Sequence, residues 1–205
     1  MPTKLFFFQI RWQNRFRDDN GSECLVTVDG VDFPINEPLY SRNTVEFVIW
    51  FSHKINGPAL RYELGVCIQT GDIVWIAGPF PPGQWPDSVI FDFAMKKELA
   101  EGERVEADAG YMGPDLPVRH PNDFGGNEQW KRMKGRARAR HEQVNAILKQ
   151  FNILGQTFRH SKHKHYRVVL AVAAIVQSEI EEGNMVHQVD YHIHRPTGFP
   201  PIPHY

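Results

Sequence analysis

Apolar and polar residues alternate in short stretches of the chain, and this spacing predicts β-strands. Residues 24–29 alternate and end at Asp29-Gly30, which predicts a strand followed by a turn. Residues 36–61 are polar and aromatic without a regular period, so they predict an irregular insertion. The first part of the chain therefore predicts one short strand and a long connection.

A second set of strand-like residues surrounds a clear turn signal. Residues 62–70 and 72–77 are rich in residues that favour strands and flank Gly71-Asp72, which predicts a β-hairpin. Prolines and glycines interrupt residues 78–86, so this stretch predicts no regular structure.

Beyond the hairpin, the pattern changes from strand to helix and back. Asp87 and Ser88 are residue types that begin helices, and they predict a helix that continues to about residue 99. Residues 103–107 predict another strand, which ends at Asp108.

The last third of the chain has the spacing of helices. A loop rich in Gly, Pro and Asn is expected over 109–128, followed by a long helix over 129–150. Another helix is expected over 166–182, and a proline- and histidine-rich loose arm follows residue 183. Apolar residues of the long helix recur at i, i+3, i+4 and i+7, namely Val144, Ile147, Leu148 and Phe151.

The predicted order of elements is strand, hairpin, helix, strand, helix, helix. This order favours an α/β fold in which helices cover a mixed sheet. It matches the ribonuclease H-like order, in which an antiparallel three-strand meander precedes parallel strands and crossover helices. The 205 residues are enough for one domain with a real core.

Composition excludes several classes of protein. The formal net charge is −1, so any attraction to nucleic acid has to come from local basic patches. Cys24 and Cys67 lie in apolar segments without nearby partners, which predicts buried free thiols in a reducing compartment and no zinc site. No stretch is long and apolar enough for a membrane span, and the arginine-rich start is not that of a signal peptide.

Three carboxylates stand at positions where a phosphodiester-cutting site needs them. Asp29 and Asp108 end predicted strands, and Glu142 lies on the long predicted helix. Two-metal cleavage needs carboxylates that converge on ions about 4 Å apart. The spacing is explained equally well by a turn at Asp29-Gly30 and a solvated polar helix face at Glu142.

Two further aspartates have competing explanations. Asp87 is a helix cap on local grounds and a fourth candidate site residue. Asp32 is expected to share the strand face of Asp29 and to have a supporting or structural role.

Four motifs in this order resemble the transposases of the PIF/Harbinger type, within the IS5-like group of DDE transposases. They are Val28-Asp-Gly-Val31, Gly83-Gln-Trp-Pro-Asp-Ser88, Glu106-Ala-Asp-Ala-Gly-Tyr111, and Arg138 with Glu142 and Lys149. The resemblance covers most of residues 24–182. It implies that Asp29, Asp108 and Glu142 are catalytic, and it raises Asp87 from a cap to a site residue.

The resemblance also implies cofactors, partners and a location. Asp29, Asp87, Asp108 and Glu142 are expected to bind two Mg²⁺ or Mn²⁺ ions, with DNA as the substrate. A separate Myb-like DNA-binding protein and an oligomer on DNA are further expectations. A eukaryotic source implies the nucleus, and any other source implies the cytoplasm.

Six lysines and arginines lie within residues 131–140, next to Glu142. Such side chains supply the sequence-independent part of DNA affinity, although a solvated helix face is the alternative explanation. A second basic stretch, 159–165, is expected to be a polar helix entry near DNA rather than a zinc site. The residues expected to contact DNA are Arg136, Arg138, Arg140 and Lys149.

The chain departs from the family's pattern in ways that open a second function. Val31 replaces a threonine, and Gly135 stands where a tyrosine is usual. The expected organisation is an N-terminal segment without a helix-turn-helix domain (1–23), a nuclease domain (24–183) and a tail (184–205). The alternative function is therefore an inactive, domesticated or truncated remnant that binds DNA or a protein.

Overall fold

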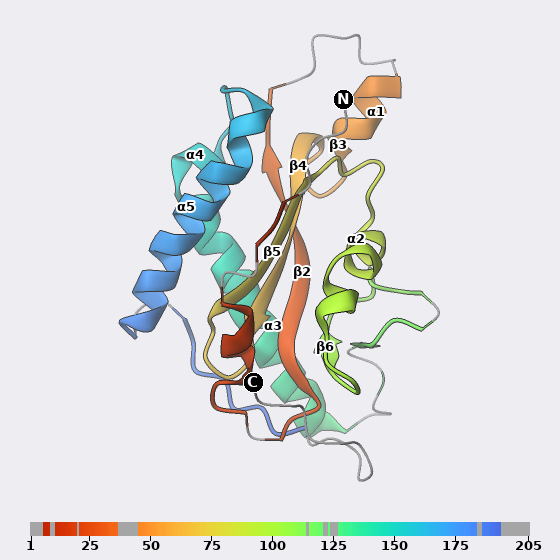
Figure 1. Ribbon diagram of the computed structural model, residues 1–205, viewed down its shortest axis with the longest axis vertical. Helices are drawn as coiled ribbons and strands as arrows, with labels where there is room; N and C mark the ends of the chain where they lie inside the picture. The colour runs from red at the N-terminus through yellow and green to blue at the C-terminus, as the bar shows by residue number, and fades with distance from the viewer. Residues whose placement is uncertain are drawn as a thin grey trace.

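Strand β2 (Cys24–Pro34) lies in the middle of a mixed sheet in the computed structural model (Figure 1). The structure describes residues 6–8, 11–19, 21–36, 45–113, 115–120, 123, 127–183 and 186–193. The strands lie in the order β1-β5-β4-β2-β6-β7, and the short strand β3 pairs with β4. The other strands are β1 (Phe6–Phe8), β3 (Phe51–Ser52), β4 (Gly57–Cys67), β5 (Ile73–Phe80), β6 (Arg104–Glu106) and β7 (Val118–Arg119).

The sheet combines an antiparallel meander with two parallel strands. β2, β4 and β5 pair antiparallel, whereas β6 runs parallel to β2 and β7 runs parallel to β6. Connections between parallel strands need crossovers, and the segment that holds α2 is the crossover that leads into β6.

Helices cover both faces of this sheet. Helices α3 (Glu128–Gln150), α4 (Asn152–Gly155) and α5 (Lys162–Glu181) cover one face, and α2 (Asp87–Phe93) covers the other (Figure 1). The 3₁₀ helices η1 (Trp12–Phe16) and η2 (Met95–Glu98) join α2, and the short helix α1 (Val45–Trp50) precedes β3. This arrangement is the ribonuclease H-like α/β fold that the sequence predicts.

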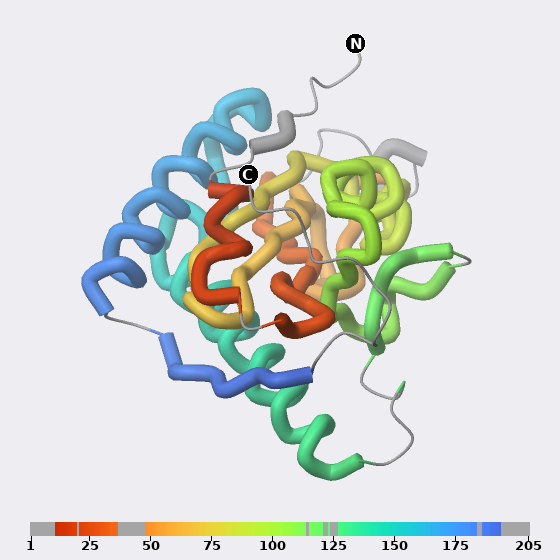
Figure 2. Tube along the Cα trace, turned by 60° about the horizontal axis from the view of Figure 1, so that its bottom comes forward, coloured from red at the N-terminus to blue at the C-terminus, as the bar shows by residue number. Residues whose placement is uncertain are grey.

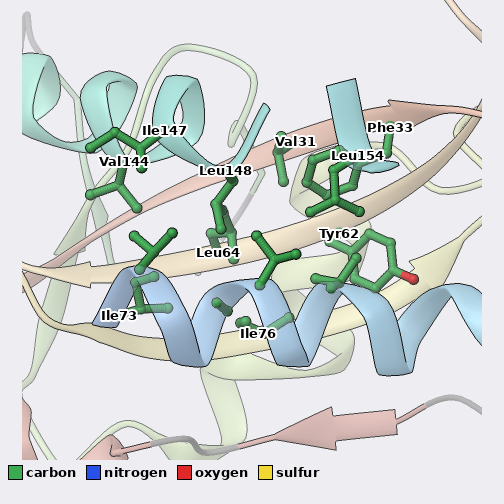
Figure 3. Close-up of a cluster of buried hydrophobic side chains, with 14 of the residues drawn as sticks. Val31, Phe33, Tyr62, Leu64, Ile73, Ile76, Val144, Ile147, Leu148 and Leu154 are labelled. Atoms are coloured by element: carbon green, nitrogen blue, oxygen red, sulfur yellow. The ribbon is translucent and has the colours of Figure 1, made fainter. Parts of the chain in front are cut away.

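Alternate residues of β2 enter two different cores. Val31 and Phe33 pack with Leu148 of α3 and with α5 on one face (Figure 3). Val26 and Val28 pack with α2 and η1 on the other face. Successive strand side chains point to opposite faces, so the strand is buried on both sides and its alternation is weak.

Several strands extend beyond their predicted bounds. β2 does not turn at Gly30 but continues to Pro34, because residues up to Pro34 pair with β4. β4 begins at Gly57, and α1 and β3 precede it, so the predicted lack of regular structure is wrong for residues 45–52 and 57–61, whereas residues 37–44 lie outside the described residues. Local composition resembles a loop there, whereas the strand is fixed by partners remote in sequence.

The predicted breaks at glycine and proline are shifted. β5 continues through Gly78-Pro79 to Phe80, because an irregularity in the β4–β5 ladder next to Glu63 accommodates the proline. The helix that begins at Asp87 ends at Phe93 rather than at residue 99. The strand β7 lies within the predicted loop, and α5 begins at Lys162, four residues earlier than predicted.

The predicted loose arm is wrong for residues 186–193. Val189, Tyr191 and Ile193 are buried, and they pack against Cys24 of β2 and Ala137 of α3. Figure 2 shows this segment in blue, crossing beside α3. Residues 194–205 lie outside the described residues.

The prediction of two free, buried cysteines is confirmed. Cys24 and Cys67 are both free and buried, and burial raises the pKa of each thiol. Within the described part of the chain, the search for a helix with the length and apolar character of a membrane span found none.

Candidate active site

The site lies where β6 separates from β2. The parallel pairing of these strands ends at Thr27 and Glu106, and a cavity of about 310 Å³ opens directly beyond this point. β2, the end of β6 and the first half of α3 form its walls. The cavity is lined by Thr27, Val28, Asp29, Glu106, Ala107, Asp108, Lys131, Lys134, Gly135, Arg138, His141 and Glu142.

Asp29 points from β2 toward α3. Its Oδ2 accepts a hydrogen bond of 3.2 Å from Nδ2 of Asn145, one turn after Glu142 on α3. Its Oδ1 lies 3.4 Å from Nζ of Lys54, and its side chain is 32% exposed. The carboxylate is therefore held in place and is still open to solvent.

The loop after β6 holds Asp108 at the cavity. The Gly110 amide donates a hydrogen bond of 2.8 Å to Oδ1 of Asp108. Tyr111 anchors the same loop, because its side chain is fully buried and packs edge-on against Phe91 of α2. The Asp-x-Gly-Tyr motif thus has a structural explanation in which the tyrosine fixes the turn that presents the aspartate.

Glu142 stands on the exposed side of α3 at the cavity. Its Oε1 accepts a hydrogen bond of 2.9 Å from Nε of Arg138, four residues earlier. Both side chains are about 60% exposed, so the ion pair is a weak and easily exchanged contact.

Asp87 is held by two cations and does not cap helix α2. The N-cap of α2 is Pro86, and no side chain caps the helix. Oδ2 of Asp87 accepts a hydrogen bond of 3.0 Å from Lys54, and its Oδ1 lies 3.2 Å from Nη1 of Arg61. Asp87 does not line the cavity but lies beside it, joined to Asp29 through Lys54.

Gly30 permits Asp87 to approach β2. A Cβ atom at this position would lie 2.2 Å from Oδ1 of Asp87, which no real contact allows. The glycine after Asp29 is therefore not a turn residue, as the sequence suggested, but a gap in the strand surface for a second aspartate.

Asp32 does not share the face of Asp29. It lies three residues further along the strand and therefore on the opposite face. Its two oxygens accept hydrogen bonds of 2.7 and 2.8 Å from Arg61, and Ser52 donates a third of 2.5 Å. This buried group confirms the structural role and contradicts the shared face.

Lys54 contacts two of the candidate carboxylates, and the sequence did not indicate it. Burial alone would lower the pKa of its ammonium, but the negative charges of Asp29 and Asp87 raise it above the ordinary value. The ammonium also donates a hydrogen bond of 2.7 Å to the Gly30 carbonyl. Lys54 lies in the segment predicted to be irregular, where no motif marks it.

His141 lines the cavity and was also not indicated by the sequence. It is buried next to Glu142, and its Nδ1 lies 2.8 Å from Oγ1 of Thr27. The Thr27 hydroxyl donates to the Val66 carbonyl, so its oxygen accepts the Nδ1 proton and Nε2 carries a lone pair. Burial lowers the pKa of His141, which keeps the ring neutral at pH 7.

The basic run on α3 divides into surface and structural residues. Arg136 and Arg138 are exposed near the cavity, and Lys149 is exposed two turns beyond Glu142. Arg140 is buried and donates hydrogen bonds to the carbonyls of Ile68, Gln69 and His187, so the expectation that it contacts DNA is wrong. Its side chain fastens the hairpin turn and the 186–193 segment to α3.

A second buried cation closes the floor of the cavity. Nζ of Lys134 lies 3.1 Å from Oε2 of Glu106 and donates to the His120 carbonyl. Tyr191 donates a hydrogen bond to the other oxygen of Glu106. This group joins the end of β6 to α3.

The donor set of the site fits hard divalent cations. Mg²⁺ and related ions take carboxylate and carbonyl oxygens, which Asp29, Asp87, Asp108 and Gly30 supply here. Throughout the described residues, no three carboxylate, histidine or cysteine side chains already lie close enough to hold an ion. The carboxylates are instead held by protein cations, Lys54 at Asp29 and Asp87 and Arg138 at Glu142.

The ribonuclease H-like sheet thus carries Asp29 within β2 and Asp108 just after β6, and Glu142 lies on α3 at the same cavity. A comparison with protein-family profiles matched residues 28–177 to the DDE superfamily endonuclease family. The chain therefore belongs to the DDE superfamily endonucleases. Searches of curated proteins and of solved structures gave no match.

Proposed function

We propose that this protein cuts DNA strands with the help of divalent metal ions. The observation that carries the proposal is that Asp29, Asp108 and Glu142 line one cavity although they come from three distant segments. Membership of the DDE superfamily endonucleases supports the reaction class. Asp87, beside the cavity, completes the group of four carboxylates.

The four carboxylates would hold two Mg²⁺ or Mn²⁺ ions, as the chemistry of oxygen donors indicates. Bound ions supply activation of a water or a DNA 3′-hydroxyl and stabilisation of the leaving oxygen during in-line displacement at phosphorus. Asn145 orients Asp29, and the Gly110 amide orients Asp108. No covalent bond between protein and DNA is needed.

Exposed cations beside the cavity provide the DNA contacts in this proposal. Arg136 and Arg138 precede Glu142 on α3, and Lys149 follows it. Lysine and arginine side chains bind phosphates without reading sequence, so they position the backbone at the cavity. The partial charge neutralisation of Glu142 by Arg138 ends when a metal ion or a phosphate binds there.

The closer resemblance to PIF/Harbinger transposases supports finer proposals. These are action on transposon ends in the nucleus, a separate Myb-like DNA-binding partner and an oligomer on DNA. They rest on the four motifs, and the organisation into segments 1–23, 24–183 and 184–205 rests on the same resemblance.

The decisive experiment is nicking of supercoiled plasmid in Mn²⁺ by the wild type and by Asp108→Asn. We expect the wild type to nick and the variant to lose at least about a thousandfold in rate, because the amide cannot act as an anionic ligand. Asp92→Asn is the matched control, since Asp92 is an exposed α2 aspartate paired only with Lys96 among the ion pairs of the described residues.

Two results would contradict the proposal in different ways. Cleavage retained by Asp108→Asn would remove the assignment of the site. DNA binding without cleavage by the wild type, across Mg²⁺ and Mn²⁺, would instead identify an inactive binding module.

A further inference from the structure

The Lys54 ammonium lies in a cage of oxygen atoms at the proposed metal site. Its Nζ is 2.7 Å from the Gly30 carbonyl, 3.0 Å from Oδ2 of Asp87 and 3.4 Å from Oδ1 of Asp29. Two carboxylates and one carbonyl are the donors that a hard divalent cation takes in proteins. The cage therefore offers the same chemistry to an ammonium and to a metal ion.

The backbone that carries Lys54 is fixed by hydrogen bonds, whereas its side chain is partly exposed to solvent. Oγ of Ser52 accepts hydrogen bonds from the amides of Lys54 and Ile55 and donates to Asp32, which Arg61 holds. The Lys54 side chain is 40% exposed, and its ammonium lies at the end of a flexible four-carbon stem. The ammonium can therefore leave the cage toward solvent without a change in the fold.

Electrostatic repulsion prevents the Lys54 ammonium and a divalent metal ion from occupying the cage together. An ammonium and a divalent ion within about 4 Å of each other repel strongly, and two carboxylates do not offset three positive charges. Occupation of the cage by one cation thus excludes the other.

We propose that the Lys54 ammonium occupies a divalent-cation position between Asp29, Asp87 and the Gly30 carbonyl, and that it has to leave before a metal ion binds there. This inference rests on the proposed function, because it concerns the same carboxylates. It adds the Gly30 carbonyl to the metal donors and makes Lys54 a built-in competitor. In the absence of metal, Lys54 keeps Asp29 and Asp87 close together without repulsion.

The test is Mn²⁺ binding by isothermal titration calorimetry to the wild type and Lys54→Met. Methionine keeps most of the length and removes the charge, so we expect Mn²⁺ to bind at least about tenfold more tightly. Lys54→Arg keeps the positive charge and should bind Mn²⁺ no more tightly than the wild type. Lys96→Met, at an exposed lysine paired with Asp92 at 2.7 Å, controls for loss of a surface charge.

A second measurement is thermal unfolding without metal. Lys54→Met should melt at a lower temperature than the wild type, because Asp29 and Asp87 then repel each other, and saturating Mn²⁺ should restore the loss. Lys96→Met should show neither change. Lys54→Gln serves as a second neutral variant with the same expected order of affinities.

The outcomes separate this inference from the proposed function. Equal Mn²⁺ affinity of the wild type and Lys54→Met, with both losing it upon Asp108→Asn, would overturn the role of Lys54 and retain the metal site. No Mn²⁺ binding by either protein would overturn both. Tight binding by Lys54→Met and weak binding by the wild type would establish the competition.

Discussion

Asp29 and Asp32 lie three residues apart on the same strand, yet their carboxylates differ in burial and in hydrogen-bond partners. The Asp32 side chain is fully buried, and Arg61 binds both of its oxygens at 2.7 and 2.8 Å. Asp29 is 32% exposed, and its nearest donors are Asn145 at 3.2 Å and Lys54 at 3.4 Å. One carboxylate has a complete set of partners, and the other is loosely held.

The difference shows how a structural carboxylate can be distinguished from a candidate catalytic one. At Asp32 a planar guanidinium binds both carboxylate oxygens and the Ser52 hydroxyl donates to one of them, so the charge is already neutralised and its oxygens are occupied. A lysine on a flexible stem occupies one oxygen and is exchangeable. The pKa of Arg61 illustrates the first case, since burial alone would lower it and its hydrogen bonds to Asp32 raise it above the ordinary value.

The largest expected effect follows from breaking the buried pair. Arg61→Met leaves Asp32 buried without its guanidinium, which typically destabilises a protein by about 3–5 kcal/mol. Urea denaturation measures the free energy of unfolding. Lys54→Met is the matched control, and its effect should be about 1 kcal/mol or less because its contacts are part exposed.

Equal losses in the two variants would contradict this comparison. Arg61 also lies 3.2 Å from Oδ1 of Asp87, so the double variant Arg61→Met with Asp32→Asn separates the two partners. If Asp32 carries the effect, the double variant should regain part of the lost stability, since no unpaired charge remains buried.

The next largest effect is a pH dependence of the stability of the fold, which arises from His165 beside the end of β2. His165 is buried against Phe33 and Phe158, and its Nδ1 lies 2.9 Å from the Tyr62 hydroxyl. Burial lowers the pKa of His165 from 6.5 to about 4. The neutral ring is favoured in the folded state, so the unfolded chain binds more protons between these two values.

Stability from His165 is therefore fully present above pH 6.5 and is lost as the pH falls toward 4. The loss should reach about 2–3 kcal/mol. Thermal unfolding across this pH range should show a shallower decline in His165→Phe than in the wild type. Parallel profiles in the two proteins would show that the histidine does not carry the dependence.

Much of the fold could be predicted from the sequence because its signals are local. The apolar spacing of Val144, Ile147 and Leu148 predicted α3, and Gly71-Asp72 predicted the β4–β5 hairpin. The limits of β2 and β4 could not be predicted, since Gly30 and Pro58 resemble loop residues. Gly30 is held in β2 by its pairing with Glu63, remote in the sequence, and Pro58 is held in β4 by its pairing with Phe51 of the short strand β3.

The site was predicted in part for a similar reason. Asp29, Asp108 and Glu142 are in motifs of fixed spacing, and the structure brings them to one cavity. Lys54 belongs to no motif and reaches the site from a turn whose position depends on the Ser52–Asp32 contact. Arg140 has the same local signature as Arg136 and Arg138, and burial alone distinguishes it.

A smaller effect is expected when the approach of Asp87 to β2 is blocked. Gly30→Ala places a Cβ where it would lie 2.2 Å from Oδ1 of Asp87, so the carboxylate has to move away. Such overpacking typically lowers the free energy of unfolding by about 1–3 kcal/mol. We expect the free energy of Mn²⁺ binding to fall by more than the free energy of unfolding, because the displaced group is a proposed metal ligand. Calorimetry and urea denaturation measure the two quantities.

Gly57→Ala is the control for Gly30→Ala. Gly57 is also a strand glycine, but the nearest atom to its added Cβ is the Ile55 carbonyl oxygen at 4.0 Å. Unchanged metal affinity in both variants would show that the position of Asp87 has no influence on the site.

The smallest effect is a salt dependence of stability. It distinguishes the contacts of Asp29 from those of Asp32 without a substitution at either aspartate. The Debye length falls from roughly 14 Å at 0.05 M to about 3 Å at 1 M salt, so contacts between part-exposed charges weaken, whereas buried pairs are screened much less. In metal-free protein, the difference in melting temperature between the wild type and Lys54→Met should shrink as NaCl rises over this range. The difference between the wild type and Arg61→Met should stay nearly constant, because the Asp32 side chain is fully buried and that of Arg61 is only 9% exposed.

Equal salt dependence of the two differences would mean that Asp29 and Asp32 are held in the same way, and Asp29 would then have no exchangeable partner to yield to a metal ion.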